Sequence, residues 1–372
     1  MKKEKIHRGQ IDRAEARCRI LYVASTASHL YRFHQPYLEA LKAEFDVLTM
    51  ANGEDVDYAI PFQKRLFGLR NLRAICSIRR ILRREPFDGV ILNTTLAAFL
   101  VRAAMIGLRE RPAVLNIVHG YLFDRPVKGM SARLMLLCEQ IASRYTDEIA
   151  VMNREDLEIA RQYRLARGRI HFVRGMGYTL GQNCGCPDPS LRQSLAPCGE
   201  RLLTYVGELS ARKNQAFLIR CVARLRGKGI GIRLMLVGDG QARGALEALI
   251  RARGLENDVL LLGNREPILP YLAVTDLYVS ASRVEGLPFN VMEAMACGLP
   301  MVISDCKGQR DLLCADSNRL YPVGDEAAFC NLVERALKGE RLGAGAVAYT
   351  GLDAYTLKSV FNENLSIMKG FF

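Results

Sequence analysis

Two glutamates, Glu285 and Glu293, stand eight residues apart in the stretch VEGLPFNVMEAMACGLP. Asn290 is a typical N-cap, and Glu293, three positions later, would complete a capping box in a helix that Gly298 closes. This local role leaves Glu285 unexplained. On one continuous helix the two carboxylates would point about 80° apart, so they can meet one ligand only if Glu285 lies in the preceding loop. Such a pair would accept hydrogen bonds from the hydroxyl groups of a ligand.

Glycine turns and a lysine in the same half of the chain could hold a diphosphate. Gly207 follows the strand-like run LLTYV, and a helix start and Lys213 come within the next seven residues. Gly238 follows the run LMLV and also opens a helix. Such turns are common in any doubly wound sheet, so each alone fits a structural role better than a functional one. Their occurrence beside the two glutamates is what indicates a binding site.

The elements that must position these residues alternate between strands and helices. Strand-like runs in the first half are RILYVA, FDVLTMA, FDGVILN, AVLNIVH and EIAVMN, and RLLTYV, IRLMLV, DVLLLGN, DLYVSAS and PMVISD repeat the pattern in the second. This alternation predicts the α/β class, with two doubly wound, Rossmann-like domains that face each other across a cleft. We expect a disordered N-terminus at 1–18, a first domain at 19–176, a linker at 177–200, a second domain at 201–350, and a C-terminal helix at 351–372 that packs back on the first domain.

The charge and cysteine content limit the possible partners and compartments. The chain has 52 Lys and Arg against 39 Asp and Glu, and this net charge of +13 suits an anionic partner such as a phosphorylated substrate or a membrane surface. No aromatic stacking platform accompanies the charge, so no nucleic acid is expected. Eleven scattered cysteines argue against a disulfide framework and for a reducing compartment. The sequence has no signal peptide and no long apolar run, so we expect a cytoplasmic protein that does not span a membrane.

The motifs, taken in order, resemble the retaining glycosyltransferases of the GT-B fold, family 4, in their bacterial capsular and exopolysaccharide branch. EGLPFNVMEAMACGLP resembles the signature of two glutamates in that family, and VGELSARKN resembles its phosphate-binding loop. LMLVGDG, LLGNREPILPYLAVTDLYVSAS and MVISDCKGQRDLL continue the match from Leu202 to Asp325, and the first half is similar more loosely, in LYVASTASHLYRFHQPYLEAL and IVHGYLF. The resemblance implies that the first domain faces the acceptor and that the second binds a nucleotide sugar.

The resemblance also implies roles for single residues. Glu293 would accept hydrogen bonds from the ribose of the nucleotide, and Glu285 would face the transferred sugar. Lys213 would stabilise the negative charge that grows on the leaving diphosphate. Arg265 would sit beside the base, and His119 would reach the sugar from the other domain. Glu285, Lys213 and His119 are therefore the catalytic residues that the resemblance predicts.

Backbone turns and two further histidines complete the predicted site. The turn from Gly286 to Asn290 would offer N–H groups to the sugar and the diphosphate. The predicted donor-binding residues are Gly207, Lys213, Gly238, Arg265, Glu285, Gly286, Phe289, Asn290 and Glu293. His29 and His34 could line the acceptor side, and they fit a structural role equally well.

The expected activity is the transfer of a sugar, with retention of anomeric configuration, from a UDP-sugar to a polyprenyl-diphosphate-linked glycan. Neither a metal nor a cofactor is expected, because lysine and helix termini serve the diphosphate and no DxD-like motif occurs in a suitable loop. A UDP-sugar 2-epimerase on the same fold is one alternative, although no residue spacing demands the acid and base it would need. A weakened subunit that serves as a scaffold is another, because Glu208 stands where the phosphate loop usually has arginine. Arg212 or Arg283 could compensate.

A basic segment, KRLFGLRNLRAICSIRRILRR at 64–84, predicts contact with the inner face of the cytoplasmic membrane. It has eight basic residues and no acidic one. Its arginines Arg79, Arg80, Arg83 and Arg84 would face anionic headgroups. Its apolar residues Leu72, Ile75, Ile78 and Leu82 recur at helical spacing, and they would lie either in the lipid boundary or in the core of the domain.

Overall fold

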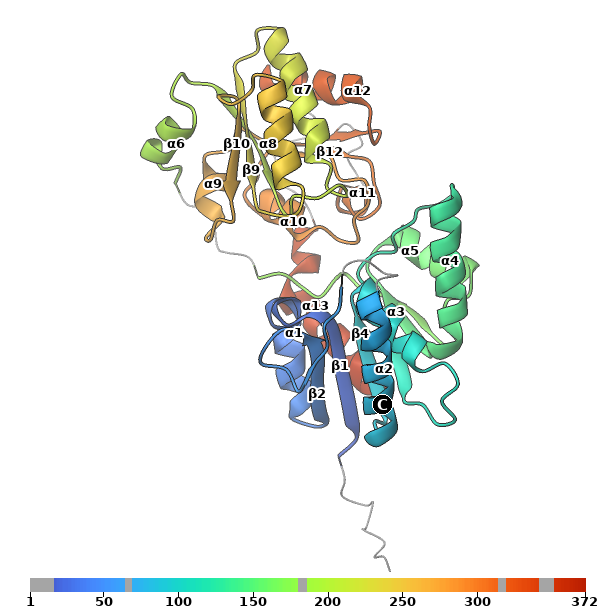
Figure 1. Cartoon of the computed structure of the whole chain (residues 1–372). Helices are drawn as coiled ribbons and strands as arrows, with labels where there is room; N and C mark the ends of the chain where they lie inside the picture. Colours follow the sequence, from blue (N-terminus) through green and yellow to red (C-terminus); the bar gives the residue numbers. More distant parts are fainter. Residues whose placement is uncertain (1–16, 64–68, 180–185, 314–318, 341–350) are drawn as a thin grey trace, which may run out of the picture. The chain divides into compact units, whose positions relative to one another are not determined.

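The computed structural model describes residues 17–63, 69–179, 186–313, 319–340 and 351–372 (Figure 1). Most of the predicted disordered start at 1–18 and the first residues of the basic segment, 64–68, lie outside these ranges. The chain divides into two compact units. The first comprises residues 1–117, 144–148 and 365–372, and the second comprises residues 118–143 and 149–364.

One sheet has seven strands in the order β3-β2-β1-β4-β5-β6-β7. The strands are β1 (Arg19–Thr26), β2 (Asp46–Asn52), β3 (Tyr58–Ala59), β4 (Gly89–Asn93), β5 (Ala113–Val118), β6 (Glu148–Val151) and β7 (Ile170–Phe172). The pairs within each unit are parallel. All five residues of β4 are buried, as expected of a strand that is covered on both faces.

Helices connect these strands. They are α1 (Ala27–Lys42), α2 (Leu69–Arg84), α3 (Thr95–Ala104), α4 (Met130–Ala142) and α5 (Arg154–Gln162). In the first unit α1 packs against β1 and β2, and α3 packs against β1 and β4 (Figure 1).

The second sheet has six strands in the order β10-β9-β8-β11-β12-β13, and all of its pairs are parallel. The strands are β8 (Arg201–Val206), β9 (Ile232–Val237), β10 (Val259–Gly263), β11 (Leu277–Ser280), β12 (Met301–Ser304) and β13 (Leu320–Tyr321). The helices between them are α7 (Gln215–Gly227), α8 (Arg243–Ala252), α9 (Leu269–Ala273), α10 (Phe289–Ala296), α11 (Gln309–Leu312) and α12 (Glu326–Leu337). The predicted α/β class with two parallel, helix-flanked sheets is confirmed.

The strand order of the second sheet reverses direction between β8 and β11. From β8 the sheet grows one way through β9 and β10 and the other way through β11, β12 and β13. At such a switch point the loops after the two central strands separate, and this leaves a crevice outside their carboxyl ends. The loops after β8 and β11 are therefore the places where a ligand of this sheet is expected.

The basic segment forms α2, and most of its apolar residues lie in the core of the first unit. Ile78 and Leu82 are buried, Ile75 is partly buried against the same cluster, and only Leu72 is exposed. Arg79 donates to the carbonyl oxygen of Ala104, at 3.0 Å. Of the two alternatives for the apolar residues, the structure therefore shows the core, and the contact of the arginines with a membrane stays a prediction.

A short helix in the linker and one cysteine differ from the expectations. The segment predicted as a linker contains the short helix α6 (Pro189–Leu195), which begins because Asp188 accepts a hydrogen bond from the amide of Ser190. Cys297 is disulfide-bonded, which was not expected, whereas eight other cysteines of the described ranges are free. The C-terminal helix α13 (Leu357–Gly370) ends in the first unit, where Lys369 pairs with Glu44 at 2.5 Å. In the part of the chain that the structure describes, no helix is long and apolar enough to cross a membrane.

Candidate active site

A buried ion pair joins the two loops at the switch point of the second sheet. Lys213 comes from the loop after β8 and Glu285 from the loop after β11, and their side chains meet with Nζ 2.5 Å from Oε1. Both residues are less than a tenth exposed. Arg212 adds a second cation, because its guanidinium donates to Oε2 of Glu285 at 3.1 Å and to the carbonyl oxygen of Val284 at 2.9 Å. The structure thus brings together two of the three predicted catalytic residues.

Electrostatics hold Glu285 in its charged form. Burial by itself would raise the pKa of this carboxyl group, but the charges of Lys213 and Arg212 and the hydrogen bond from Lys213 oppose it, and the pKa ends below its usual value. Glu285 therefore remains an acceptor of hydrogen bonds at neutral pH. An anion that entered beside it would find two cations already positioned.

The predicted glycines after β8 and β9 pack against each other. Gly207 has a φ of +141°, and Gly238 has a φ of +135°. A Cβ on Gly238 would lie 2.1 Å from the carbonyl oxygen of Gly207, so no side chain fits there. This close approach gives Gly238 a structural reason to be glycine, and the loop that carries Lys213 depends on it.

Helix α10 begins earlier than expected, which corrects the capping assignment. Its N-cap is Pro288, so Asn290 is already helical and Glu293 is too far along to complete a capping box with it. The side-chain amide of Asn290 instead donates to the carbonyl oxygen of Val206 at 2.5 Å, which ties α10 to the end of β8. Glu293 is half-buried on the helix. The capping explanation for Glu293 therefore fails, and a ligand-binding role remains a prediction.

The C-terminal end of α10 follows the expectation. Gly298 has a φ of +65°, and its amide donates to the carbonyl oxygen of Met295 at 2.9 Å. The amide of Leu299 donates to Ala294 at 3.1 Å, which completes a Schellman motif. Gly298 closes the helix as predicted.

The loop that carries His119 lies against the loop that carries Glu285. A Cβ on Gly286 would fall 1.8 Å from the carbonyl oxygen of His119, and a Cβ on Gly120 would fall 2.8 Å from Cα of Gly286. Gly308, in the loop after β12, is equally close, since its Cβ would lie 2.4 Å from the carbonyl oxygen of Gly286. Because glycines stand at these contacts, the backbone of His119, the third predicted catalytic residue, lies directly against the loop that carries Glu285.

A buried polar network, which the sequence did not predict, connects the loop that carries His119 with the loop that carries Glu285. Lys307 is 2% exposed, and its ammonium donates to Oδ1 of Asp156 at 2.8 Å and to the carbonyl oxygen of Phe123 at 2.7 Å. The other oxygen of Asp156 accepts from the amide of Tyr121 at 3.2 Å and from the side chain of Asn153 at 2.7 Å. Asn153 also donates to the carbonyl oxygen of Gly286 at 3.1 Å.

Each end of this network has a local cause. Asn153 is the N-cap of α5 and accepts from the amide of Asp156, so both side chains are fixed by the first turn of that helix. Lys307 follows β12 at the carboxyl end of the sheet. Burial raises the pKa of Asp156, and the charge of Lys307 only partly opposes it. The only signal in the sequence was an Asn-capped helix start next to an acidic residue, which does not reveal a partner 151 residues away.

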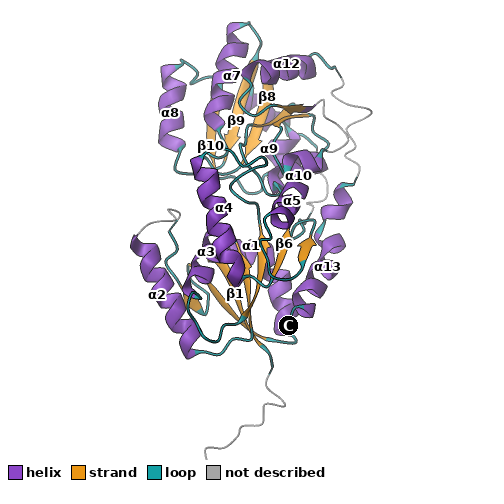
Figure 2. Cartoon of the chain, turned by 90° about the vertical axis from the view of Figure 1, so that its right-hand side faces the viewer, coloured by secondary structure: helices purple, strands orange, loops and turns teal. Residues whose placement is uncertain are grey.

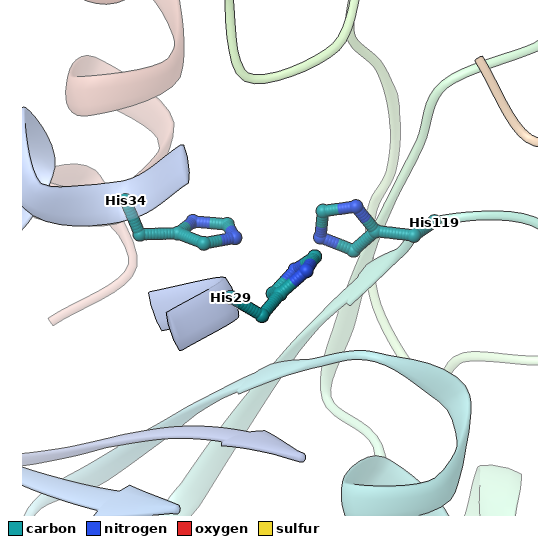
Figure 3. Close-up of side chains that lie close together, drawn as sticks. All are labelled: His29, His34 and His119. Carbon is teal, nitrogen blue, oxygen red and sulfur yellow. The ribbon is translucent and has the colours of Figure 1, made fainter. Parts of the chain in front are cut away.

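The remaining predicted residues lie at other places. Arg265 is exposed after β10, near the edge of the second sheet. His29 and His34 are on α1, with ring centroids 5.4 Å apart, and Nδ1 of His34 lies 2.9 Å from the hydroxyl of Tyr22. Burial lowers the pKa of His29 to about 4. Figure 3 draws the rings of His29 and His34 as sticks. Each ring offers a nitrogen atom that can ligate a metal ion.

A cavity of about 500 Å³ adjoins the network. Its charged residues are mostly paired: Arg310 contacts Glu155 at 3.1 Å and Asp305 at 2.7 Å, and Arg125 pairs with Glu158. Its lining has four basic and three acidic residues, so most of its positive charge is already neutralised.

Comparisons with known proteins identify the family of the chain. The family described as Glycosyl transferase 4-like domain matches residues 24–175, and the family described as Glycosyl transferases group 1 matches residues 200–339. EpsD of Bacillus subtilis, which is named as a glycosyltransferase, is 28% identical over 85% of this chain and 87% of its own length. An Escherichia coli UDP-Gal:alpha-D-GlcNAc-diphosphoundecaprenol alpha-1,3-galactosyltransferase is 23% identical over 72% of this chain and 70% of its own length.

Solved structures give the fold. HepE of Anabaena, in complex with UDP and glucose, superposes with a TM-score of 0.72 over 95% of this chain and all of its own, at 18% identity. The sucrose-phosphate synthase of Thermosynechococcus elongatus superposes with a TM-score of 0.70 over 95% of this chain, at 18% identity. The two family matches cover the two sheets in turn, and the chain is therefore a glycosyltransferase of the GT-B fold, built from a 4-like domain and a group 1 domain.

Proposed function

We propose that this glycosyltransferase transfers a sugar from a UDP-sugar to a polyprenyl-diphosphate-linked glycan, with retention of anomeric configuration and without a metal ion. It would act in exopolysaccharide or capsule biosynthesis, at the inner face of the cytoplasmic membrane. The observation that carries the proposal is the buried contact of Lys213 and Arg212 with Glu285 at the switch point of the second sheet.

The chemistry of sugar transfer needs the groups that this contact supplies. As the glycosidic bond breaks, positive charge develops on the sugar and negative charge on the departing diphosphate. Lys213 and Arg212 would stabilise the diphosphate, and because they are held by Glu285 before the donor arrives, little reorganisation is needed. Glu285 would accept hydrogen bonds from the transferred sugar. His119 would complete the sugar site, since its backbone adjoins Gly286.

The same residues support the proposed metal independence. In enzymes that use Mg²⁺ for this step, the ion neutralises the diphosphate and carboxylates hold the ion. Here Arg212 and Lys213 provide two positive charges next to the loop turn at Gly207. Glu208 stands where the phosphate loop usually has arginine, and Arg212 would supply the missing positive charge through its position beside Glu285. This favours an active enzyme over a scaffold.

The acceptor is proposed from the relatives. The galactosyltransferase of Escherichia coli is named for a diphosphoundecaprenol acceptor. A Campylobacter jejuni N-acetylgalactosaminyltransferase, 32% identical over 38% of this chain and 39% of its own length, is also named for a diphospho-undecaprenol substrate. The exopolysaccharide setting is proposed from the similarity to EpsD, which extends over most of this chain.

Donor selection and mechanism can be tested in two steps. Thermal unfolding with UDP, GDP and their sugar derivatives should show the largest stabilisation with a UDP-sugar, by about 3 kcal/mol at a hundredfold excess over the dissociation constant. Transfer to a synthetic polyprenyl-diphosphate glycan should then persist in EDTA, and NMR of the product should show the anomeric configuration of the donor. An inverted product, or activity that EDTA abolishes and a metal restores, would contradict the proposal.

A further inference from the structure

An exposed apolar stripe runs along α4. Eight large apolar side chains are exposed in the described part of the chain, and five of them fall between residues 122 and 141. Four of these five are on α4, where Met130 is 83% exposed, Leu134 49%, Leu137 51% and Ile141 49%. We call these four residues the α4 stripe. Exposed apolar patches of this kind mark binding sites for proteins or membranes.

The α4 stripe is a surface feature and is not the face that packs into the core. Steps of four, three and four residues place the four side chains within about 60° of one another around the helix. On the other side of α4, Leu136, Glu139 and Ala142 are buried. α4 lies at the right-hand edge of Figure 1 and toward the viewer in Figure 2. The helix therefore has two apolar sides, and only one of them is covered.

The charge around the α4 stripe fits an anionic lipid surface. Between residues 126 and 143 the chain carries two basic residues, Lys128 and Arg133, and one acidic residue, Glu139, which is only 6% exposed. A basic, apolar helix face can lie in the headgroup region, with its apolar side chains below the phosphates and its cations among them. A second copy of the chain would fit poorly, because a symmetric contact would set the same cations against each other.

We propose that the α4 stripe, with Lys128 and Arg133, docks the enzyme on an anionic bilayer. This inference rests on the proposed function, since a polyprenyl-linked acceptor keeps its lipid in the bilayer while its sugar enters the active site. The stripe starts at Met130, eleven residues after His119, and both belong to the second compact unit. We therefore propose the membrane contact at α4 rather than at α2, whose apolar residues are mostly buried.

The absence of tryptophan from the sequence allows a direct test. Leu137→Trp places a single indole on the α4 stripe, and Leu72→Trp places one on α2 as a matched control, since Leu72 is 59% exposed. Vesicles of phosphatidylcholine with phosphatidylglycerol should shift the emission of the Leu137→Trp protein to shorter wavelength and leave that of the Leu72→Trp protein unchanged. Equal shifts in both proteins, or no shift at position 137, would overturn the proposal.

Loss of binding provides the second test. Leu134→Ser with Leu137→Ser should weaken co-sedimentation with the same vesicles on the order of a hundredfold, because each half-exposed leucine that enters lipid contributes roughly tenfold. Leu72→Ser should bind as the wild type does. Arg133→Gln with Lys128→Gln should abolish the preference for anionic over neutral vesicles. If the leucine variant binds normally, or if it instead changes the oligomeric state without lipid, the stripe serves another partner and the proposal is wrong.

Activity separates this inference from the proposed function. With a water-soluble acceptor that lacks the polyprenyl chain, the Leu134→Ser, Leu137→Ser protein should turn over as the wild type does. With the acceptor embedded in vesicles, it should be slower by the factor lost in binding. Equal rates on embedded acceptor would refute docking by α4 and leave the transferase proposal intact. Absence of transfer to every acceptor, with vesicle binding retained, would refute the proposed function alone.

Discussion

Replacing Lys307 by methionine should test how firmly the loops of the site are held. The substitution keeps the length of the side chain and removes the ammonium that donates to Asp156 at 2.8 Å and to the carbonyl oxygen of Phe123 at 2.7 Å. Asp156, which is fully buried, would be left with a charge and no cation. Breaking a buried ion pair in this way typically costs about 3–5 kcal/mol of unfolding free energy.

The pH dependence of this cost follows from Asp156. Its pKa is raised by burial and held down in part by Lys307, so in the Lys307→Met protein it should rise further. A carboxyl group whose pKa is higher in the folded than in the unfolded protein binds its proton more tightly when folded, and stability then falls as the pH rises through the folded pKa. The variant should therefore lose more stability at pH 8 than at pH 5.

Urea unfolding followed by far-UV circular dichroism measures both effects. Lys228→Met is a suitable control, because its ion pair with Glu334 is at the surface and should contribute no more than about 1 kcal/mol. The double variant Lys307→Met, Asp156→Asn should lose less unfolding free energy than the sum of the losses in its two single variants, because each single variant already removes the same ion pair. A cost for Lys307→Met within about 1 kcal/mol of the control at pH 8, or one that does not decrease at pH 5, would refute this reasoning.

Three further outcomes concern the site itself. Glu285→Gln should slow transfer about a hundredfold or more without changing the circular dichroism spectrum, since it acts on developing charge, and a rate near that of the wild type would exclude the assigned role. Glu293→Gln should raise the dissociation constant of UDP in calorimetry, whereas a lower melting temperature with unchanged affinity would indicate a structural residue. Gly286→Ala should abolish donor binding and destabilise the protein, because the new Cβ would lie 1.8 Å from the carbonyl oxygen of His119; normal binding would show that the loops can separate at no cost.

Much of the fold could be predicted because its determinants are local. Buried runs such as GVILN and LLTYV, separated by helical periodicity, predict parallel strands and their order along the chain. The meeting of Lys213 with Glu285 could be expected in outline, since both follow strands and the carboxyl ends of parallel strands lie at one edge. Helix starts were less certain: Pro288 rather than Asn290 is the N-cap of α10, and the side-chain amide of Asn290 donates to the carbonyl oxygen of Val206 instead.

The features that could not be predicted depend on contacts between distant parts of the chain. Nothing near Lys307 in the sequence indicates Asp156, because neither residue has a local pattern that requires a buried partner. The exposure of an apolar residue on a helix cannot be predicted from its local sequence either. Ile78 and Leu137 both occur at helical spacing in basic segments, yet Ile78 is fully buried and Leu137 is 51% exposed. Which apolar face a helix buries depends on its neighbours in the fold, and for this reason the sequence indicated α2 where we propose α4.

The central claim is that cations held at Glu285 stabilise the departing diphosphate of a nucleotide sugar. The most direct measurement is the initial rate of transfer from a UDP-sugar to a polyprenyl-diphosphate glycan, in EDTA, by the wild type, Lys213→Ala and the surface control Lys228→Ala. We predict that Lys213→Ala is slower by a hundredfold or more in kcat while its fold is retained, and that Lys228→Ala equals the wild type. A folded Lys213→Ala enzyme that transfers sugar at the wild-type rate would contradict the claim.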